Sequence, residues 1–363
     1  MSADLPAELR DDPAAALLWE AVSRYSPSGE EGEVSRLLVD WMGRRDFAAE
    51  VDPAGNAVGR RGRGPLQVVL LGHIDTAPGW LAPRLEGGRL FGRGAVDAKG
   101  PFCSFLCAVS GLDRAALERM TLTCIGAVEE ECPTSKGARY ALTRYRPDLV
   151  LIGEPSGWQG LTLGYKGRLI ARATVQRPSH HGAAGLEGAA DLLVGFCGRA
   201  KRWAGRAAGG ERPGSLFAQV QLRVEALNSQ RDGLSELASA DLGLRLPPGV
   251  EPEQAATALQ QLAGDAVELS FLGQERAHLC ERDSPLSRAL RLAIRAEGGT
   301  PHFTYKTGTS DMNVVAPHWA VPMLAYGPGD SSLDHTPGEA LDLDEYRKAS
   351  AVLERALRSL APS

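Results

Sequence analysis

Three short apolar runs that end in polar residues constrain the fold of this chain most strongly. The runs are LQVVLLGHID (66–75), TLTCIGAV (121–128) and DLVLIG (148–153). Helical patterns separate them, at 101–112 and about 135–145. Apolar strands that alternate with helices predict an α/β fold, in which helices cover both faces of a mostly parallel sheet.

The middle of the chain follows a different pattern. From about residue 165, apolar and polar residues alternate as they do in strands with one solvated face, and helical patterns lie between these strands. The first pattern returns after about residue 284. We therefore predict a discontinuous α/β domain formed by residues 1–164 and 276–363, with an inserted α+β domain over 165–275.

The composition excludes several classes of protein. The net charge of -5 and the isoelectric point near 5.9 give no electrostatic basis for binding nucleic acid. The N-terminal stretch MSADLPAELRDD is polar and acidic, and no apolar run is long enough to span a membrane. We expect a cytoplasmic protein that binds neither nucleic acid nor membrane.

Histidines and carboxylates follow the predicted strands. The carboxyl ends of parallel strands meet at one edge of a sheet, where ligand sites form. Five positions of this kind are His73 and Asp75, the triplet Glu129–Glu131, Glu154, Asp97 in the loop GRGAVDAKG, and His335 in SLDHTPGE. Each alone has an ordinary explanation, such as a hydrogen-bonded histidine or a solvated glutamate pair. Together they favour a two-zinc site, because zinc binds imidazole nitrogen and carboxylate oxygen.

Seven motifs in this order resemble a known family. They are GHIDTAPG, GRGAVDAKG, EEE, LIGEPS, SHHGA, KTGTSDMN and DHTPGE. The chain resembles the co-catalytic zinc exopeptidase and deacylase superfamily, of the acetylornithine deacetylase and succinyl-diaminopimelate desuccinylase type. Within it, EEECPTSKGAR, YKTGTSDMNVV and YGPGDSSLDHTPGE are most similar to hydrolases that release lysine or ornithine from an amino-group carrier protein.

The resemblance implies a role for each metal-site residue. His73 and Glu154 would bind one zinc ion, a glutamate of the triplet and His335 would bind the other, and Asp97 would bridge the two. Cobalt is an alternative metal. Asp75 would orient His73, and the bond between Asp97 and Ala98 would be a cis peptide.

The triplet can be aligned with the family in two ways. The preferred register makes Glu130 the general base and Glu131 the metal ligand. It leaves CPTSK between Glu131 and Gly137, one residue more than relatives often have. The other register makes Glu129 the base and Glu130 the ligand, and it lengthens that gap further.

The resemblance also assigns the inserted domain. It would be a lid and dimerisation domain in a homodimer, and a lid histidine would reach the partner subunit's site to stabilise the oxyanion. His181 fits this role better than the adjacent His180. The positions where relatives hold the substrate are Asn228, Arg245, Lys306, Gly308 and Thr309.

These expectations define one activity and two alternatives. The favoured activity is hydrolysis of the C-terminal γ-glutamyl amide that links lysine, or ornithine, to a small carrier protein in lysine and arginine biosynthesis. Basic residues on a predicted lid helix would meet that carrier: Arg199, Lys201, Arg202 and Arg206. The alternatives are a small-molecule deacylase, such as acetylornithine deacetylase or succinyl-diaminopimelate desuccinylase, and a non-catalytic member that has lost its metals.

Overall fold

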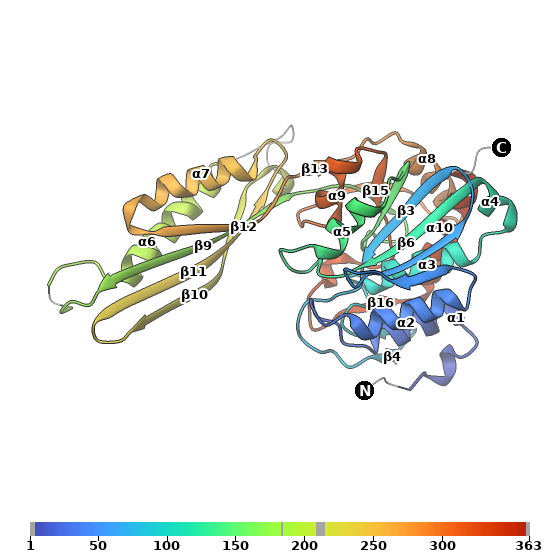
Figure 1. Cartoon of the computed structure of the whole chain (residues 1–363), viewed down its shortest axis with the longest axis horizontal. Helices are drawn as coiled ribbons and strands as arrows, with labels where there is room; N and C mark the ends of the chain where they lie inside the picture. The colour runs from blue at the N-terminus through green and yellow to red at the C-terminus, as the bar shows by residue number, and fades with distance from the viewer. Residues whose placement is uncertain (1–3, 183, 208–214, 361–363) are drawn as a thin grey trace. The chain divides into compact units, whose positions relative to one another are not determined.

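A computed structural model of the chain describes residues 4–182, 184–207 and 215–360. Its contacts divide the chain into two compact units. Unit 1 contains residues 1–164, 280–304 and 310–363, and unit 2 contains residues 165–279 and 305–309. Figure 1 labels the elements of both units.

Unit 1 is built from a mixed sheet, a small second sheet and helices. Its helices are α1 (Pro13–Val22), α2 (Gly32–Gly43), α3 (Lys99–Ser110), α4 (Arg114–Arg119), α5 (Lys136–Arg144), α8 (Pro285–Ala296), α9 (Asp311–Trp319) and α10 (Leu343–Leu360). The main strands are β1 (Ala48–Val51), β2 (Ala57–Gly62), β3 (Leu66–His73), β6 (Met120–Ala127), β7 (Leu149–Gly153), β8 (Gly160–Tyr165) and β15 (Met323–Ala325). The small sheet contains β4 (Arg84–Glu86), β5 (Arg89–Phe91) and β16 (Ala340–Asp342).

The centre of the main sheet is parallel. The strand order is β1-β2-β6-β3-β7-β15-β8, and β3 pairs in parallel with both β6 and β7. Every residue of β6 and β7 is buried. Because successive side chains point to opposite faces, this burial means that both faces of the sheet are covered. The structure therefore confirms the predicted mostly parallel sheet with helices on both faces.

The described residues of unit 2 form an antiparallel sheet that packs against helices. The strand order is β10-β11-β9-β12. The strands are β9 (Gly167–Pro178), β10 (Gln221–Arg231), β11 (Ser235–Leu246) and β12 (Glu268–Glu275). Burial alternates along β11, and its buried residues share a core with residues of α6 (Ala189–Ala204) and α7 (Pro252–Ala263). Figure 1 shows α6 and α7 on one face of this sheet.

Two short strands lie near the boundaries of the units, β13 (His278–Leu279) and β14 (His302–Lys306). The sequence placed residues 305–309 in the discontinuous domain, whereas their contacts place them in unit 2. The reason is a set of hydrogen bonds. The N–H of Lys166 donates to the carbonyl of Lys306 at 3.3 Å, and the hydroxyl of Thr309 donates to the carbonyl of Lys166 at 3.0 Å. In the described part of the chain, no helix has the length and apolar character that crossing a membrane requires.

Candidate metal centre

Three neighbouring parallel strands end level with one another at one edge of the main sheet. His73, the last residue of β3, is in register with Ala127 of β6, and Gly72 is in register with Gly153 of β7. The residues that follow these strands therefore emerge at the same edge. They are His73 itself, the glutamate triplet after β6, and Glu154 after β7.

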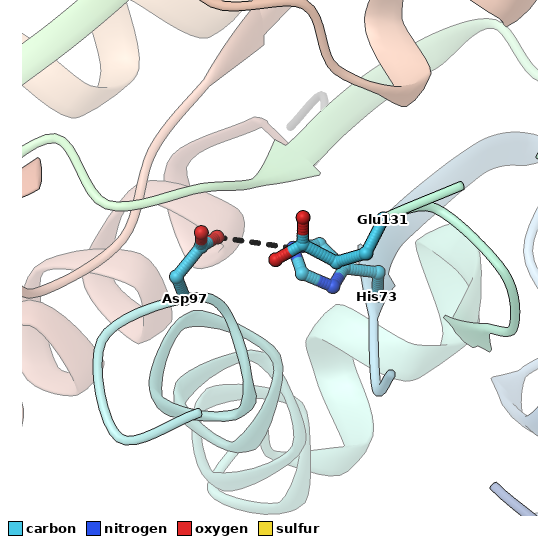
Figure 2. Close-up of side chains that lie close together, drawn as sticks. All are labelled: His73, Asp97 and Glu131. Carbon is cyan, nitrogen blue, oxygen red and sulfur yellow. Dashed lines mark hydrogen bonds and ion pairs between the residues drawn. The ribbon is translucent and has the colours of Figure 1, made fainter. Parts of the chain in front are cut away.

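Asp97 lies between two histidines from distant parts of the sequence. Its Oδ1 is 3.2 Å from Nε2 of His73, and its Oδ2 is 2.9 Å from Nε2 of His335. Oε1 of Glu131 is 2.8 Å from the same nitrogen of His335. Figure 2 shows His73, Asp97 and Glu131 close together, and one ligand atom from each of the three lies within 4.8 Å of the others. The peptide bond between Asp97 and Ala98 is cis, as the resemblance implied.

Asp75 holds the ring of His73. Nδ1 of His73 lies 3.0 Å from the backbone carbonyl oxygen of Asp75 and 3.4 Å from its carboxylate. A carbonyl oxygen can only accept, so Nδ1 carries the proton and donates. In a neutral imidazole the lone pair is then on Nε2, the nitrogen that faces Asp97. This is the tautomer that binds a cation at Nε2.

Two carboxylates also fix the backbone of the glutamate triplet. The oxygens of Asp75 accept the N–H groups of Glu130 and Glu131, each at 3.0 Å. The carboxylate of Glu31 accepts the N–H of Glu129 at 3.1 Å. Glu129 itself has a φ of 60°, in the left-handed region, so the chain turns sharply after β6.

The side chain of Glu129 is engaged away from the histidines. Its Oε2 accepts the hydroxyl hydrogen of Thr134 at 2.6 Å, and its Oε1 lies 3.4 Å from Nζ of Lys136. Glu131, in contrast, contacts His335. This geometry favours the register in which Glu131 is the ligand.

The site concentrates negative charge in a buried place. Burial is the largest cause that raises the pKa of Glu130, Glu131 and Glu154, and neighbouring carboxylates raise it further. Burial also acts to raise the pKa of Asp97, but hydrogen bonds with the two histidines outweigh it and hold this pKa below its usual value. Contacts with Asp97 and Glu131 raise the pKa of His335 to about 11. Grouped carboxylates of this kind are stabilised by a bound divalent cation.

The donor set fits such an ion. Two ligands at about 2.0–2.2 Å from one tetrahedral zinc ion are about 3.3–3.5 Å apart. The separation of 3.2 Å between His73 and Asp97 is close to that value, whereas the separations of 2.9 and 2.8 Å from His335 to Asp97 and Glu131 are shorter. Imidazole nitrogen and carboxylate oxygen are also the ligand types that catalytic zinc sites use.

Comparison with known proteins identifies the family. Residues 69–359 match peptidase family M20/M25/M40. The chain belongs to this family. A LysW-lysine hydrolase from Deinococcus radiodurans is 55% identical over 351 residues, which cover 96% of this chain and 97% of that protein. A LysW-lysine/LysW-ornithine hydrolase from Sulfurisphaera tokodaii is 26% identical over 366 residues, 95% of this chain and 94% of that protein.

Solved structures of the M20 family share the fold. An M20 family metallo-carboxypeptidase from Sulfolobus solfataricus superposes with a TM-score of 0.81 at 19% identity. The match covers 96% of this chain and 99% of that one. At this identity the likeness establishes the fold alone.

Unit 2 of this M20 family member contains the residues predicted to bind substrate. Arg245, near the end of β11, donates from Nη1 to the hydroxyl of Thr309 at 2.7 Å. Lys306 and Gly308 belong to the same short segment as Thr309. Asn228 is exposed on β10, an edge strand.

The two candidate lid histidines follow β9 in unit 2. His180 donates from Nε2 to the carbonyl of Leu186 at 3.1 Å, so its ring is occupied within the loop. His181 is exposed. The 12 residues of β9 separate both histidines from Gly167, the start of the strand, by about 40 Å.

Two positioning carboxylates, Glu31 and Glu339, were not predicted from the sequence. Glu31 is buried and holds the turn that begins the glutamate triplet. Glu339 is also buried, and it accepts backbone N–H groups of the loop that carries Asp97. For Glu339 a signal was available, because it closes the motif DHTPGE. For Glu31 the sequence offered none.

Proposed function

We propose that this chain is a metal-dependent LysW-lysine hydrolase that acts in lysine biosynthesis in the cytoplasm. It releases lysine by hydrolysing the C-terminal γ-glutamyl amide of the carrier protein LysW. The observation that carries this proposal is the 55% identity with the Deinococcus radiodurans LysW-lysine hydrolase over 96% of the chain. Ornithine is a second candidate substrate, because more distant relatives at 26–37% identity are named for both amino acids.

Five residues hold two metal ions in this proposal. His73 and Glu154 would hold one ion, Glu131 and His335 would hold the other, and Asp97 would contribute to both. The division of the Asp97 oxygens between the two histidines supports the bridging role. The ions are zinc, with cobalt as the alternative. When bound, they supply Lewis-acid stabilisation of the scissile carbonyl and lower the pKa of the attacking water.

Glu130 acts as the general base. It takes a proton from the attacking water and passes it to the nitrogen of the leaving amine. Two observations support this role. The N–H of Glu130 is fixed by Asp75 beside the N–H of Glu131, and burial raises the pKa of the Glu130 carboxyl above its usual value.

Unit 2 supplies substrate binding. Arg245 is the clamp for the carboxylate of the lysine, since a guanidinium binds a carboxylate through two parallel hydrogen bonds. Its bond to Thr309 connects it to the segment that contains Lys306 and Gly308, which completes the binding surface. Asn228 is the remaining candidate contact.

A homodimer provides the oxyanion-stabilising histidine. His181 is assigned this role because the spacing from the lid histidine of relatives to a later glycine fits His181 with Gly188. The exposed edge strand β10 and its exposed Leu227 suit pairing with a second copy.

The carrier meets a basic surface on α6. Arg199, Lys201, Arg202 and Arg206 are exposed at and just beyond the C-terminal half of this helix. Charge reversal at these positions is expected to raise KM for carrier-bound lysine and to leave KM for a small acyl amine unchanged. Equal changes for both substrates would remove this surface from the proposal.

A hydrolysis assay tests the function directly. LysW-linked lysine, LysW-linked ornithine and N-acetylornithine are compared as substrates at equal concentration. We expect LysW-linked lysine to give the highest kcat/KM. Preference for N-acetylornithine would instead identify a small-molecule deacylase, and no hydrolysis of any substrate by the metal-loaded protein would favour a non-catalytic member.

A further inference from the structure

Glu339 connects two segments that carry proposed metal ligands. It lies four residues after His335, and its side chain is completely buried. Its partners are in the loop that ends at Asp97, more than 240 residues earlier in the chain. The contacts of one side chain therefore join the segments that present Asp97 and His335.

The carboxylate of Glu339 is saturated with donors. Its Oε1 accepts three backbone N–H groups, from Gly94 at 2.9 Å, Val96 at 3.0 Å and Asp97 at 3.2 Å. Its Oε2 accepts from Nη1 of Arg93 at 2.7 Å. A carboxylate can accept several such bonds because it has about four lone-pair sites and no hydrogen to clash with a donor.

The surrounding contacts make this arrangement rigid. Arg93 also donates to the carbonyls of Gly79 and Thr336, at 3.2 and 3.4 Å. Gly94 has a φ of +87°, and a Cβ there would lie 2.8 Å from Cγ2 of Thr76. Any other residue at position 94 would therefore strain this path of the loop, and the carboxylate of Glu339 holds the loop in it.

We infer that Glu339 is a positioning residue for the metal site, which holds Asp97 between His73 and His335 without binding an ion itself. The inference rests on the proposed function, because it concerns the two metal ions proposed there. The N–H of Asp97 is one of the three groups that Glu339 binds, so a change at Glu339 acts directly on the residue proposed to bridge the ions.

Glu339→Gln tests this inference with almost no change in shape. An amide has one oxygen and one NH₂ group. If the oxygen faces the three backbone N–H groups, the NH₂ group faces Arg93. If the amide is turned, the NH₂ group faces the backbone donors. The first orientation loses the bond from Arg93 and the second loses the bonds from the backbone, so either orientation weakens the hold on the loop.

Asp52 provides a matched control in the same unit. Its Oδ1 also accepts three backbone N–H groups, from Ala54, Gly55 and Asn56 at 2.8, 3.1 and 3.0 Å, and its Oδ2 accepts from Nδ2 of Asn56 at 2.9 Å. It is 7% exposed. Asp52→Asn therefore removes a buried carboxylate that, like Glu339, accepts three backbone N–H groups, from a loop that carries no proposed ligand.

The experiment titrates metal-free protein with Zn²⁺ against a competing chelator, and measures kcat and KM on LysW-linked lysine. Glu339→Gln is expected to weaken Zn²⁺ binding by about 10–100-fold, the usual effect of removing a partner that orients a ligand. We expect kcat to fall and KM to stay within about threefold of wild type at saturating Zn²⁺. Asp52→Asn is expected to lower the melting temperature and to keep wild-type Zn²⁺ affinity.

Three other outcomes are informative in different ways. If wild type binds Zn²⁺ and hydrolyses substrate while Glu339→Gln matches it in Zn²⁺ affinity and kcat, the positioning role is overturned and the proposed function stands. Equal losses of Zn²⁺ affinity in Glu339→Gln and Asp52→Asn would also overturn it, because the effect would then be general destabilisation. A wild-type chain that binds no Zn²⁺ would overturn the proposed function itself.

Discussion

Substitutions in the glutamate triplet test most sharply which residue binds metal and which one transfers the proton. Three single substitutions, Glu129→Ala, Glu130→Ala and Glu131→Ala, change adjacent residues that differ in their contacts. Glu131 lies 2.8 Å from His335, whereas Glu129 bonds to Thr134 and Lys136. The account therefore predicts three different results from the same chemical change.

The expected magnitudes follow from these roles. Removal of a general base costs about 10²–10⁴ in kcat, which corresponds to about 2.7–5.5 kcal/mol in the activation barrier. Glu130→Ala should show this loss and keep both metal ions. Glu131→Ala should lose turnover together with one metal ion per chain. Glu129→Ala should keep both ions and retain kcat within about tenfold of wild type, because its side chain makes only surface-type contacts.

Metal content measured by inductively coupled plasma mass spectrometry, together with kcat on LysW-linked lysine, gives both quantities for each variant. Circular dichroism verifies that each variant is folded. A Glu131→Ala protein with the wild-type metal content would refute the assignment. Loss of metal in Glu130→Ala with retention in Glu131→Ala would instead support the alternative register.

Three further predictions concern the same site. In Asp75→Asn the amide has one oxygen and cannot accept the N–H groups of both Glu130 and Glu131. Zn²⁺ affinity or kcat should therefore fall about 10–100-fold. Unchanged values in a chelator titration would contradict the role of Asp75. Inactive His181→Ala and inactive Glu130→Ala subunits should regain part of the activity when mixed, and no recovery after subunit exchange would argue against a shared site. The pKa of His335 is raised to about 11 in the metal-free protein. His335 is therefore protonated at neutral pH, and metal binding must displace that proton. The apparent affinity for the metal ion should then rise about tenfold for each pH unit below the pKa of His335, for each proton displaced. Calorimetry in buffers of different ionisation enthalpy measures the released protons, and a binding enthalpy that is the same in all buffers would contradict this.

The edge of the sheet that carries the site could be predicted because each of its strands can be recognised from its own residues. The apolar runs of β3, β6 and β7 are buried on both faces, so their composition alone indicates central strands. The helices α8 and α10 also begin at the capping residues Ser284 and Asp342, which can be recognised in the sequence. Residues that follow such strands are then brought together by the fold class itself.

Other elements depend on distant partners and were not predicted. The edge strand β12 is stabilised by pairing with β9, and α9 contains Pro317, which is unfavourable inside a helix. Glu339 is similar, because its role arises from backbone N–H groups that only the folded loop brings together. The choice of Glu131 over Glu130 as the metal ligand stays a prediction, which the 2.8 Å contact between Glu131 and His335 supports.

The central claim is that two metal ions on His73, Asp97, Glu131, Glu154 and His335 are required for hydrolysis. Stepwise chelation of the purified protein, with metal content and hydrolysis of LysW-linked lysine measured at each step, tests it most directly. The account predicts two divalent ions per chain at full activity, loss of activity as they are removed, and recovery when Zn²⁺ or Co²⁺ is returned. Full activity in protein that contains no metal would contradict it.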